Sequence, residues 1–168
     1  VTGVQTCALP ISLIELIIVI VILGILAVTA APKFMNMQGD ARAATVNAMK
    51  GSIQSAVSMV NSKAIIQGKD KSTSATDTKS VSAGSATVTV VYGYPTAKHA
   101  GIGQVLDFGS TATPTADGNI GDWSVTESTS SYVITPKGMA STDNCSVTYA
   151  AAATSSGQPT YTVVTTGC

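Results

Sequence analysis

Hydrophobic residues are distributed very unevenly along this chain. Leu13–Ala31 is an almost unbroken apolar run that carries one acid, Glu15, near its start. As a helix with a rise of 1.5 Å per residue, the run would be roughly 28 Å long, close to the ~30 Å hydrocarbon thickness of a bilayer. A helix that is apolar on all sides suits lipid or a helical bundle. The run therefore predicts a membrane-spanning or bundle-forming helix.

The pattern becomes amphipathic after Pro32, a residue that should kink or break the helix because it removes a backbone hydrogen bond. Between Asp40 and Ile66, apolar residues recur at helical spacing and polar residues occupy the other positions. We expect this second half to pack on the rest of the chain and to end near Gly68. The predicted apolar stripe consists of Met49, Ile53, Ala56, Val57, Val60 and Ala64.

The remainder is polar and rich in turn residues. Residues 67–85 show no periodicity and are predicted to form a surface loop. Short β-like runs come after this loop without further helices, which predicts an α+β fold with an antiparallel sheet packed on the amphipathic helix. The expected strands are Ala86–Tyr92, Gly101–Phe108, Ile120–Thr126, Ser131–Thr135, Ser146–Ala151 and Thr160–Thr166.

These patterns predict three parts of the chain. Residues 1–11 form a leader-like or non-native segment. Residues 12–39 form a hydrophobic transmembrane or assembly helix. Residues 40–168 form a soluble head, made of the amphipathic helix 40–66, the loop 67–85 and a sheet within 86–168.

Charge and composition narrow the classes of function. Nine basic and nine acidic residues balance, and charged residues make up only 11% of the chain, unlike a duplex-binding protein. Aromatic residues make up 5%, so the head should have a small core that depends on a disulfide or on neighbouring subunits.

Three cysteines are present, at positions 7, 145 and 168. Cys145 and Cys168 both lie in the β-like region, and a bridge between them would close a loop of about 24 residues, worth on the order of 3 kcal/mol. We expect this disulfide and, with it, an oxidising compartment; two free thiols are the alternative.

No constellation indicates a metal, a cofactor or catalysis. The cysteine spacing fits no zinc pattern, and His99 is the single histidine. The stretch Asp117–Asp122 lacks the late bidentate acid of a calcium loop and is predicted to be an ordinary turn, and Asp143 a capping or loop acid. Lys98, His99 and Asp107 form no recognisable catalytic set, and no phosphate loop, HExxH or G-x-S-x-G motif occurs. We expect no enzyme activity.

The first residues do not match the rest of the chain. No Lys or Arg precedes Lys33, whereas a targeting leader carries basic residues before its apolar core. Residues 1–11 look like a translated sequencing-adapter read-through that has replaced the true leader, in which case Cys7 has no biological role. A real but unusual N-terminus is the alternative.

The segment from Ser12 to Phe34 resembles the N-terminal helix of type IV pilins, which usually opens G-F-T-L-I-E. The similarity includes Leu13, Glu15 and Leu16 at the start, Gly24 within the apolar run, and Pro32 at the position of the family's kink. A narrower similarity, to major pilins of mannose-sensitive haemagglutinin pili, rests on MKGSIQSA, YGYPTA, CSVTYAAA and the terminal TTGC.

The resemblance implies processing by a prepilin peptidase, with methylation of the new N-terminus at position 11. Family members have Gly-Phe at this junction, where this chain has Pro10 and Ile11. A proline at the cleavage position should block processing, which agrees with an artefactual front end.

The resemblance also implies the roles of the apolar residues. Leu13, Leu16, Gly24 and Pro32 would serve assembly, with Gly24 and Pro32 letting the helix bend or unwind locally; tolerated helix breakers are the alternative. A carboxylate in an apolar span is disfavoured by up to ~3 kcal/mol, so Glu15 should have a partner, the N-terminal amine of a neighbouring subunit. A glutamate that snorkels to the membrane interface is the alternative.

On this basis we expect a structural subunit that forms a homopolymeric pilus for adhesion. It would wait in the inner membrane and then appear in an extracellular filament, aided by the pilus assembly machinery; its surface receptor is not encoded in a recognisable motif. The alternatives are a main pseudopilin of a type II secretion system, a DNA-uptake pilin and a monomeric membrane anchor. Between residues 69 and 137 the Lys/Arg residues are five lysines, with no arginine. So few basic residues argue against a nucleic-acid partner.

Overall fold

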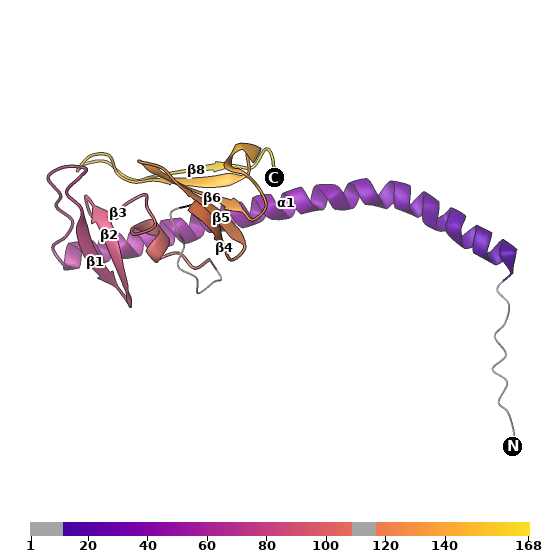
Figure 1. Cartoon of the computed structure of the whole chain (residues 1–168), viewed down its shortest axis with the longest axis horizontal. Coiled ribbons are helices and arrows are strands. Elements are labelled where there is room, and N and C mark those ends of the chain that lie inside the picture. Colours follow the sequence, from indigo (N-terminus) through magenta and orange to yellow (C-terminus); the bar gives the residue numbers. More distant parts are fainter. Residues whose placement is uncertain (1–11, 109–116) are drawn as a thin grey trace, which may run out of the picture. The chain divides into compact units, whose positions relative to one another are not determined.

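The computed structural model describes residues 12–108 and 117–168 (Figure 1). Its fold is α+β: one long helix is followed by two antiparallel sheets. The chain divides into two compact units, Val1–Gln38 and Gly39–Cys168. The predictions for Cys7, and for Pro10 and Ile11 at the processing site, concern residues outside the described part of the chain.

Helix α1 spans Leu13–Ile66, 54 residues. It continues through Pro32, so the helix is not broken there; the loss of one backbone hydrogen bond is insufficient to end a helix whose flanking turns remain bonded. The predicted kink stays a prediction.

The C-terminus of α1 confirms the predicted end near Gly68. Gly68 has a left-handed φ of 64°. Its N–H bonds the carbonyl of Ile65 at 3.0 Å, and the N–H of Lys69 bonds the carbonyl of Ala64 at 2.7 Å. These two bonds form a Schellman motif, which satisfies carbonyls that a helix end leaves unpaired.

The second half of α1 buries the predicted stripe. Every residue of that stripe is buried, and Val46 extends it by one turn toward the N-terminus. Polar residues such as Gln54 and Ser58 lie on the exposed side. The helix therefore provides one wall of the hydrophobic core of the head.

The first sheet has three strands in the order β1-β2-β3: Lys79–Ala83, Ala86–Val91 and Tyr94–Pro95. Val81 and Val88 face each other across β1 and β2. The turn between β2 and β3 consists of Tyr92 and Gly93, both with positive φ, as two-residue hairpins require.

Strand β1 corrects the prediction of an unbroken loop over residues 67–85. Its sequence, KSVSA, contains one large apolar residue, and that residue, Val81, is fully buried. One buried side chain is too weak a pattern to reveal a strand from sequence. Pairing with β2, and packing against Val60 and Ala64 of the helix, supplies what the local sequence lacks.

The second sheet is a meander of five strands, β4 to β8, in sequence order. The strands are Asp117–Ile120, Trp123–Glu127, Ser131–Pro136, Ser146–Ala150 and Thr160–Val164.

Two of the strands expected from the sequence, one in this sheet and one before it, were wrong. Ile120–Thr126 is not a single strand, because Gly121, with φ 56°, turns the chain between β4 and β5. Gly101–Phe108 is not a strand either: it contains a short 3-10 helix, η1, at Ile102–Gln104. The tight packing of Gly101 and Gly103 and the burial of Ile102 favour this turn over an extended strand.

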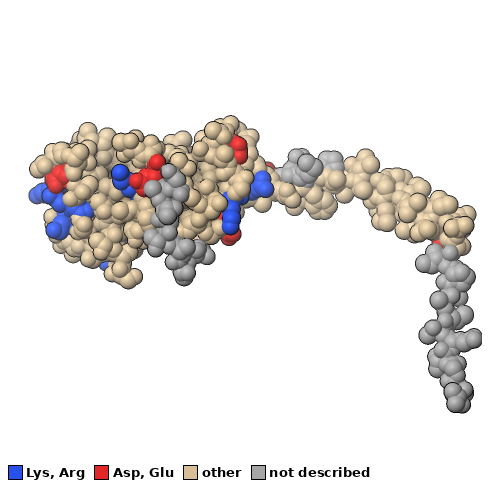
Figure 2. Space-filling model, viewed as in Figure 1, with Lys and Arg blue, Asp and Glu red and all other residues tan. Residues whose placement is uncertain are grey.

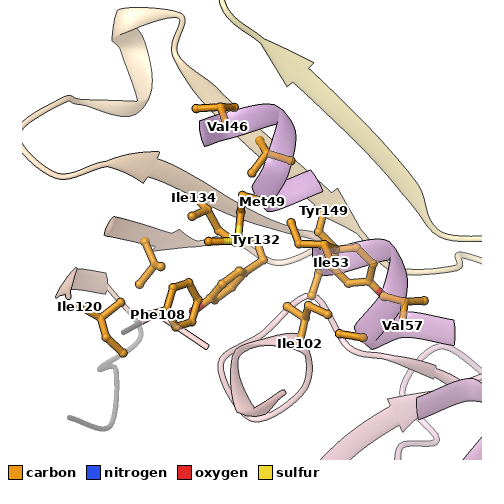
Figure 3. Packing of buried hydrophobic residues seen from close by; sticks show 14 of the residues in the cluster. Val46, Met49, Ile53, Val57, Ile102, Phe108, Ile120, Tyr132, Ile134 and Tyr149 are labelled. Atoms are coloured by element: carbon orange, nitrogen blue, oxygen red, sulfur yellow. The ribbon is translucent and has the colours of Figure 1, made fainter. Parts of the chain in front are cut away.

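The main core lies between the second half of α1 and the five-stranded sheet (Figure 3). Tyr132, Ile134 and Tyr149 are fully buried and face the helix. The hydroxyl of Tyr149 donates a hydrogen bond to the carbonyl of Pro95 at 2.7 Å, which ties strand β7 to strand β3. A second, smaller cluster lies under the three-stranded sheet.

A candidate assembly helix and the polar sites of the head

The apolar run at the start of α1 makes no contact that would bury it. Leu13–Ala31 has a mean hydropathy of 3.0 and 0% of it is buried. Leu13 is 80% exposed and Leu16 is 52% exposed. Figure 2 shows this part of the helix almost without charged side chains. By length and composition the helix is able to cross a membrane, as an anchor or as a signal sequence.

Glu15 closes the N-terminus of this helix. Its Oε2 accepts hydrogen bonds from the backbone N–H and the hydroxyl of Ser12, both at 2.8 Å. In return the Ser12 hydroxyl accepts a bond from the Glu15 N–H at 3.3 Å. This reciprocal arrangement is a capping box, which satisfies backbone donors that a helix start leaves unpaired.

Sequence reasoning missed this capping role, although its signal is present in the chain. Ser-x-x-Glu directly before an apolar run is the signature of a capping box, and Ser12-Leu13-Ile14-Glu15 fits it. Glu15 therefore has a local structural role within its own chain. Its expected pairing with a neighbouring amine stays a prediction.

Gly24 lies in open space on the same helix. A methyl group added at its Cα would meet nothing within 4 Å. Within the described chain, then, the fold does not require glycine at this position. Any requirement for it would come from a partner helix or from local unwinding.

Cys145 and Cys168 form the predicted disulfide, with a Cα–Cα distance of 4.8 Å. Cys145 is fully buried in the main core, and Cys168 packs against that core. Gly39, at the start of the buried half of α1, lies beside the Cys168 backbone, 3.5 Å from an ideal Cβ to the carbonyl carbon. The bridge therefore holds the segment after β8 against both the core and the helix.

Asp143 contributes to the same region. Its carboxylate accepts a hydrogen bond from the Ala140 N–H at 2.7 Å, at the start of the short 3-10 helix η2, Ser141–Asp143. This confirms the prediction that Asp143 is a capping or loop acid.

His99 lies in a second polar site, in the turn after β3. The backbone N–H of His99 donates to Glu127 Oε2 at 2.8 Å, and the ring Nε2 lies 2.8 Å from Gln104 Nε2. Lys98 Nζ approaches Glu127 Oε1 at 3.8 Å. Burial lowers the pKa of His99 from its usual value of 6.5, and the Glu127 carboxylate partly offsets this by raising it. His99 is therefore neutral near pH 7.

Tyr132, from β6, adjoins this site without a hydrogen-bond partner for its hydroxyl. Burial raises the pKa of Tyr132 to about 12. No hydrogen bond that the structure describes joins Asp107 to His99. The sequence had not indicated Glu127, Gln104 or Tyr132 as members of this site. No local motif could have identified Glu127 and Tyr132, because they come from strands of the five-stranded sheet.

Lysines gather at one end of the head, near the end of α1 and the start of β1 (Figure 2). Lys69 and Lys71 are exposed there, whereas Lys79 pairs with Asp77 at 2.8 Å. Over residues 12–108 and 117–168, no three His, Cys, Asp or Glu side chains come close enough to hold a metal ion. The Asp117–Asp122 stretch forms β4 and its turn.

Comparison of the chain with protein-family models, with curated proteins and with solved structures finds no match.

Proposed function

We propose that this chain is the structural subunit of a type IV pilus, which polymerises through its N-terminal helix into a surface filament for adhesion. One observation carries the proposal. A single helix, α1, has a wholly exposed apolar half and a second half whose apolar stripe is buried in its own head. The first half lacks any intramolecular partner among the described residues, so it suits lipid before assembly and other copies afterwards.

The energetics favour a filament once copies meet. Packing the exposed side chains of Leu13–Ala31 against other helices replaces lipid contacts by close helix–helix contacts, in which small residues such as Gly24 permit near approach. Repeated head-to-tail contacts produce a helical fibre when their rotation does not close into a ring, and the proposal requires contacts of that kind. The head needs no catalytic group for such a role.

Glu15 would set the register between copies. The proposal is that its carboxylate exchanges the Ser12 capping bonds for the methylated N-terminal amine of a neighbour. An ion pair removed from water is stabilising only when both charges are matched, so a neighbour at the wrong axial position would leave a buried charge unpaired. The Ser12 bonds keep the carboxylate satisfied until then.

The experiment compares Glu15→Ala with Glu15→Gln in chains given a leader with Gly at position 10 and Phe at position 11. Gln retains the capping geometry but not the charge, because a capping box accepts either residue. If the charge pairs with an amine, both variants yield far fewer sheared filaments than the parent chain. Loss of filaments in the Ala variant alone would assign Glu15 to capping. Parent amounts from the Ala variant would contradict any assembly role.

Mass spectrometry of sheared filaments tests the function itself. A methylated N-terminal peptide from position 11, together with a crosslinked Cys145–Cys168 peptide, is expected. A chain found only in the inner-membrane fraction would instead support the pseudopilin or the anchor. The same measurement reports the residue at position 11, where the resemblance to type IV pilins implies Phe.

A DNA-uptake role is the second candidate, and only the lysines near the end of α1 favour it. Phosphate contacts dominate nucleic-acid affinity. One of these lysines, Lys79, is already paired with Asp77, and Asp70 lies between Lys69 and Lys71 in sequence. A shift of labelled duplex DNA by the full chain that is lost in Lys69→Gln/Lys71→Gln would favour this candidate.

A further inference from the structure

Strand β8 is an edge strand of the five-stranded sheet (Figure 1). It pairs with β7 over its whole length, from Thr160 opposite Ala150 to Val164 opposite Ser146. Among the described residues, those of β8 make no backbone hydrogen bond outside this ladder. Because no strand lies on its other side, the N–H and C=O groups of alternate residues point away from β7 without a backbone partner. This outer edge is therefore able to pair with a further strand.

The other three edges of the two sheets carry features that oppose strand addition. β1 begins with Lys79, and β3 contains Pro95, which has no N–H. β4 contains Asp117 and Gly118. Charged residues, proline and glycine are the features that protect sheet edges from further pairing. The sequence of β8, TYTVV, contains none of them, and no charged side chain occurs in residues 145–168.

The two faces of β8 are already distinct. Tyr161 and Val163 are partly buried and pack against the main core. The ring of Tyr161 lies beside that of Tyr149 in β7, with 5.8 Å between the ring centroids. Thr160 and Thr162 are exposed on the opposite face. An added strand must match this alternation, because a shift by one residue would place its apolar side chains in solvent.

A second copy of β8 meets this requirement. When the two strands run antiparallel about a two-fold axis at Thr162, each Tyr161 lies opposite Val163 of the other copy. The same axis places Thr162 opposite Thr162 and Thr160 opposite Val164. Aromatic and β-branched pairs, and pairs of threonines, stabilise neighbouring strands. Since the strand is uncharged, no like charges meet across the axis.

We propose that the outer edge of β8 binds the same edge of a second copy of this chain, so that two five-stranded sheets join into one antiparallel sheet. The disulfide at Cys168 holds the chain just after β8, so the strand is ordered before it pairs and loses little conformational entropy. One strand of five residues from each copy provides a small interface, so the dimer is weak and depends on protein concentration.

This contact is distinct from those of the proposed filament. It is isologous, with the same surface on both copies, whereas a filament requires heterologous head-to-tail contacts. The dimer therefore does not depend on the proposed function.

The test is sedimentation equilibrium of the full chain in detergent, with micelles in excess so that each holds one copy at low protein concentration. The parent chain should change from one copy to two as its concentration rises. Thr162→Lys places two ammonium groups opposite each other at the axis, so dimerisation should weaken by roughly tenfold or more. Thr126→Lys adds the same charge to an exposed position of the interior strand β5 and should dimerise as the parent chain does.

An exchange of charge tests the two-fold register. Thr162→Glu alone should dimerise as poorly as Thr162→Lys, because like charges again meet at the axis. A mixture of the two variants should dimerise at least as well as the parent chain, because opposite charges then lie across from each other. A mixture that stays monomeric would overturn the register.

Hydrogen exchange of the parent chain provides a measurement that needs no variant. Peptides that cover residues 161–164 should exchange more slowly at high protein concentration, because the outward N–H groups gain acceptors, whereas peptides from β5 should not change. The proposal is overturned if the parent chain stays monomeric, or if exchange in β8 does not depend on concentration. Dimerisation of Thr162→Lys equal to that of the parent chain would also overturn it, because the contact would then lie elsewhere, as on the apolar half of α1.

Discussion

At the scale of single residues, carboxylates organise the least regular parts of this chain. Glu15 caps the exposed helix through Ser12, and Asp143 caps a 3-10 helix. Glu127 holds the turn after β3 by accepting a bond from the backbone N–H of His99. Each accepts a bond from a backbone N–H that would otherwise lack a partner. A carboxylate is suited to this because ionised acceptors form stronger hydrogen bonds than neutral ones.

Asp77 has the same role in the loop before β1, and a pH titration will show it. Its carboxylate accepts bonds from the Lys79 ammonium and the Thr73 N–H, both at 2.8 Å, which lower its pKa from 3.8 to about 2. The order that Asp77 gives the loop is therefore complete above pH 3.8 and is lost as pH falls through about 2. Carbon-13 NMR of the carboxyl group should report that value.

Asp77→Asn provides the accompanying variant. The amide of Thr73 should exchange faster at neutral pH in this variant, whereas Asp70→Asn, in the same loop, should leave Thr73 unchanged. Equal exchange of Thr73 in the parent chain and in Asp77→Asn would contradict the assignment.

At the scale of elements, α1 shows how one helix serves two environments. Its first half is apolar on every side, and its second half carries a stripe that fits the sheets. Both halves belong to one continuous α-helix. The two halves differ in how apolar side chains are distributed around the helix axis. This distribution decides whether a helix packs in lipid, against other helices or against its own head.

Two glycines, one inside α1 and one at its end, provide a matched pair of substitutions. Gly51→Ala, inside the helix and with nothing within 4 Å of the added carbon, should raise the free energy of unfolding by about 0.5–1 kcal/mol. Gly68→Ala also meets nothing within 4 Å, but its φ of 64° should make it destabilising by about 1–2 kcal/mol. Fluorescence of Trp123, the single tryptophan, reports unfolding of the head.

The two substitutions should change the free energy of unfolding in opposite directions. If both variants change stability in the same direction, the Schellman motif at the end of α1 does not determine the cost of a side chain at Gly68.

At the scale of the whole molecule, the head consists of two sheets that share one helix but no strand ladder among the described strands. The links between them in the described chain include the turn Thr96–Val105, which bonds Thr89 of β2 and Glu127 of β5, and the bond from Tyr149 to Pro95. The disulfide then secures the end of the chain to the main core. A head with few aromatic residues benefits from such covalent support.

Reduction of the disulfide should lower the stability of the head. Cys145 and Cys168 are 23 residues apart, and closing a loop of this size stabilises a fold by about 3 kcal/mol. Addition of a reductant should therefore lower the midpoint of thermal unfolding, followed by Trp123 fluorescence. The double variant Cys145→Ala/Cys168→Ala, which keeps Cys7, should be less stable than the parent chain and insensitive to reductant. An unchanged midpoint in the reduced parent chain would contradict a stabilising role.

The sequence by itself determined the features that depend on local chemistry. The apolar run, the buried stripe from Met49 to Ala64, the helix end at Gly68 and most strands of the second sheet follow from periodicity and backbone preference, which act over a few residues. The pairing of Cys145 with Cys168 followed from their place in the β-like region. The capping box at Ser12 was equally local and was overlooked.

Tertiary structure alone decided the rest. β1 exists because Val81 meets Val88 and the helix, and the run around Ile102 becomes a turn because the core takes its side chain. The His99 site needs Glu127 and Tyr132, about thirty residues further along the chain. Burial and long-range pairing are properties of the assembled core, so no short stretch of sequence contains them.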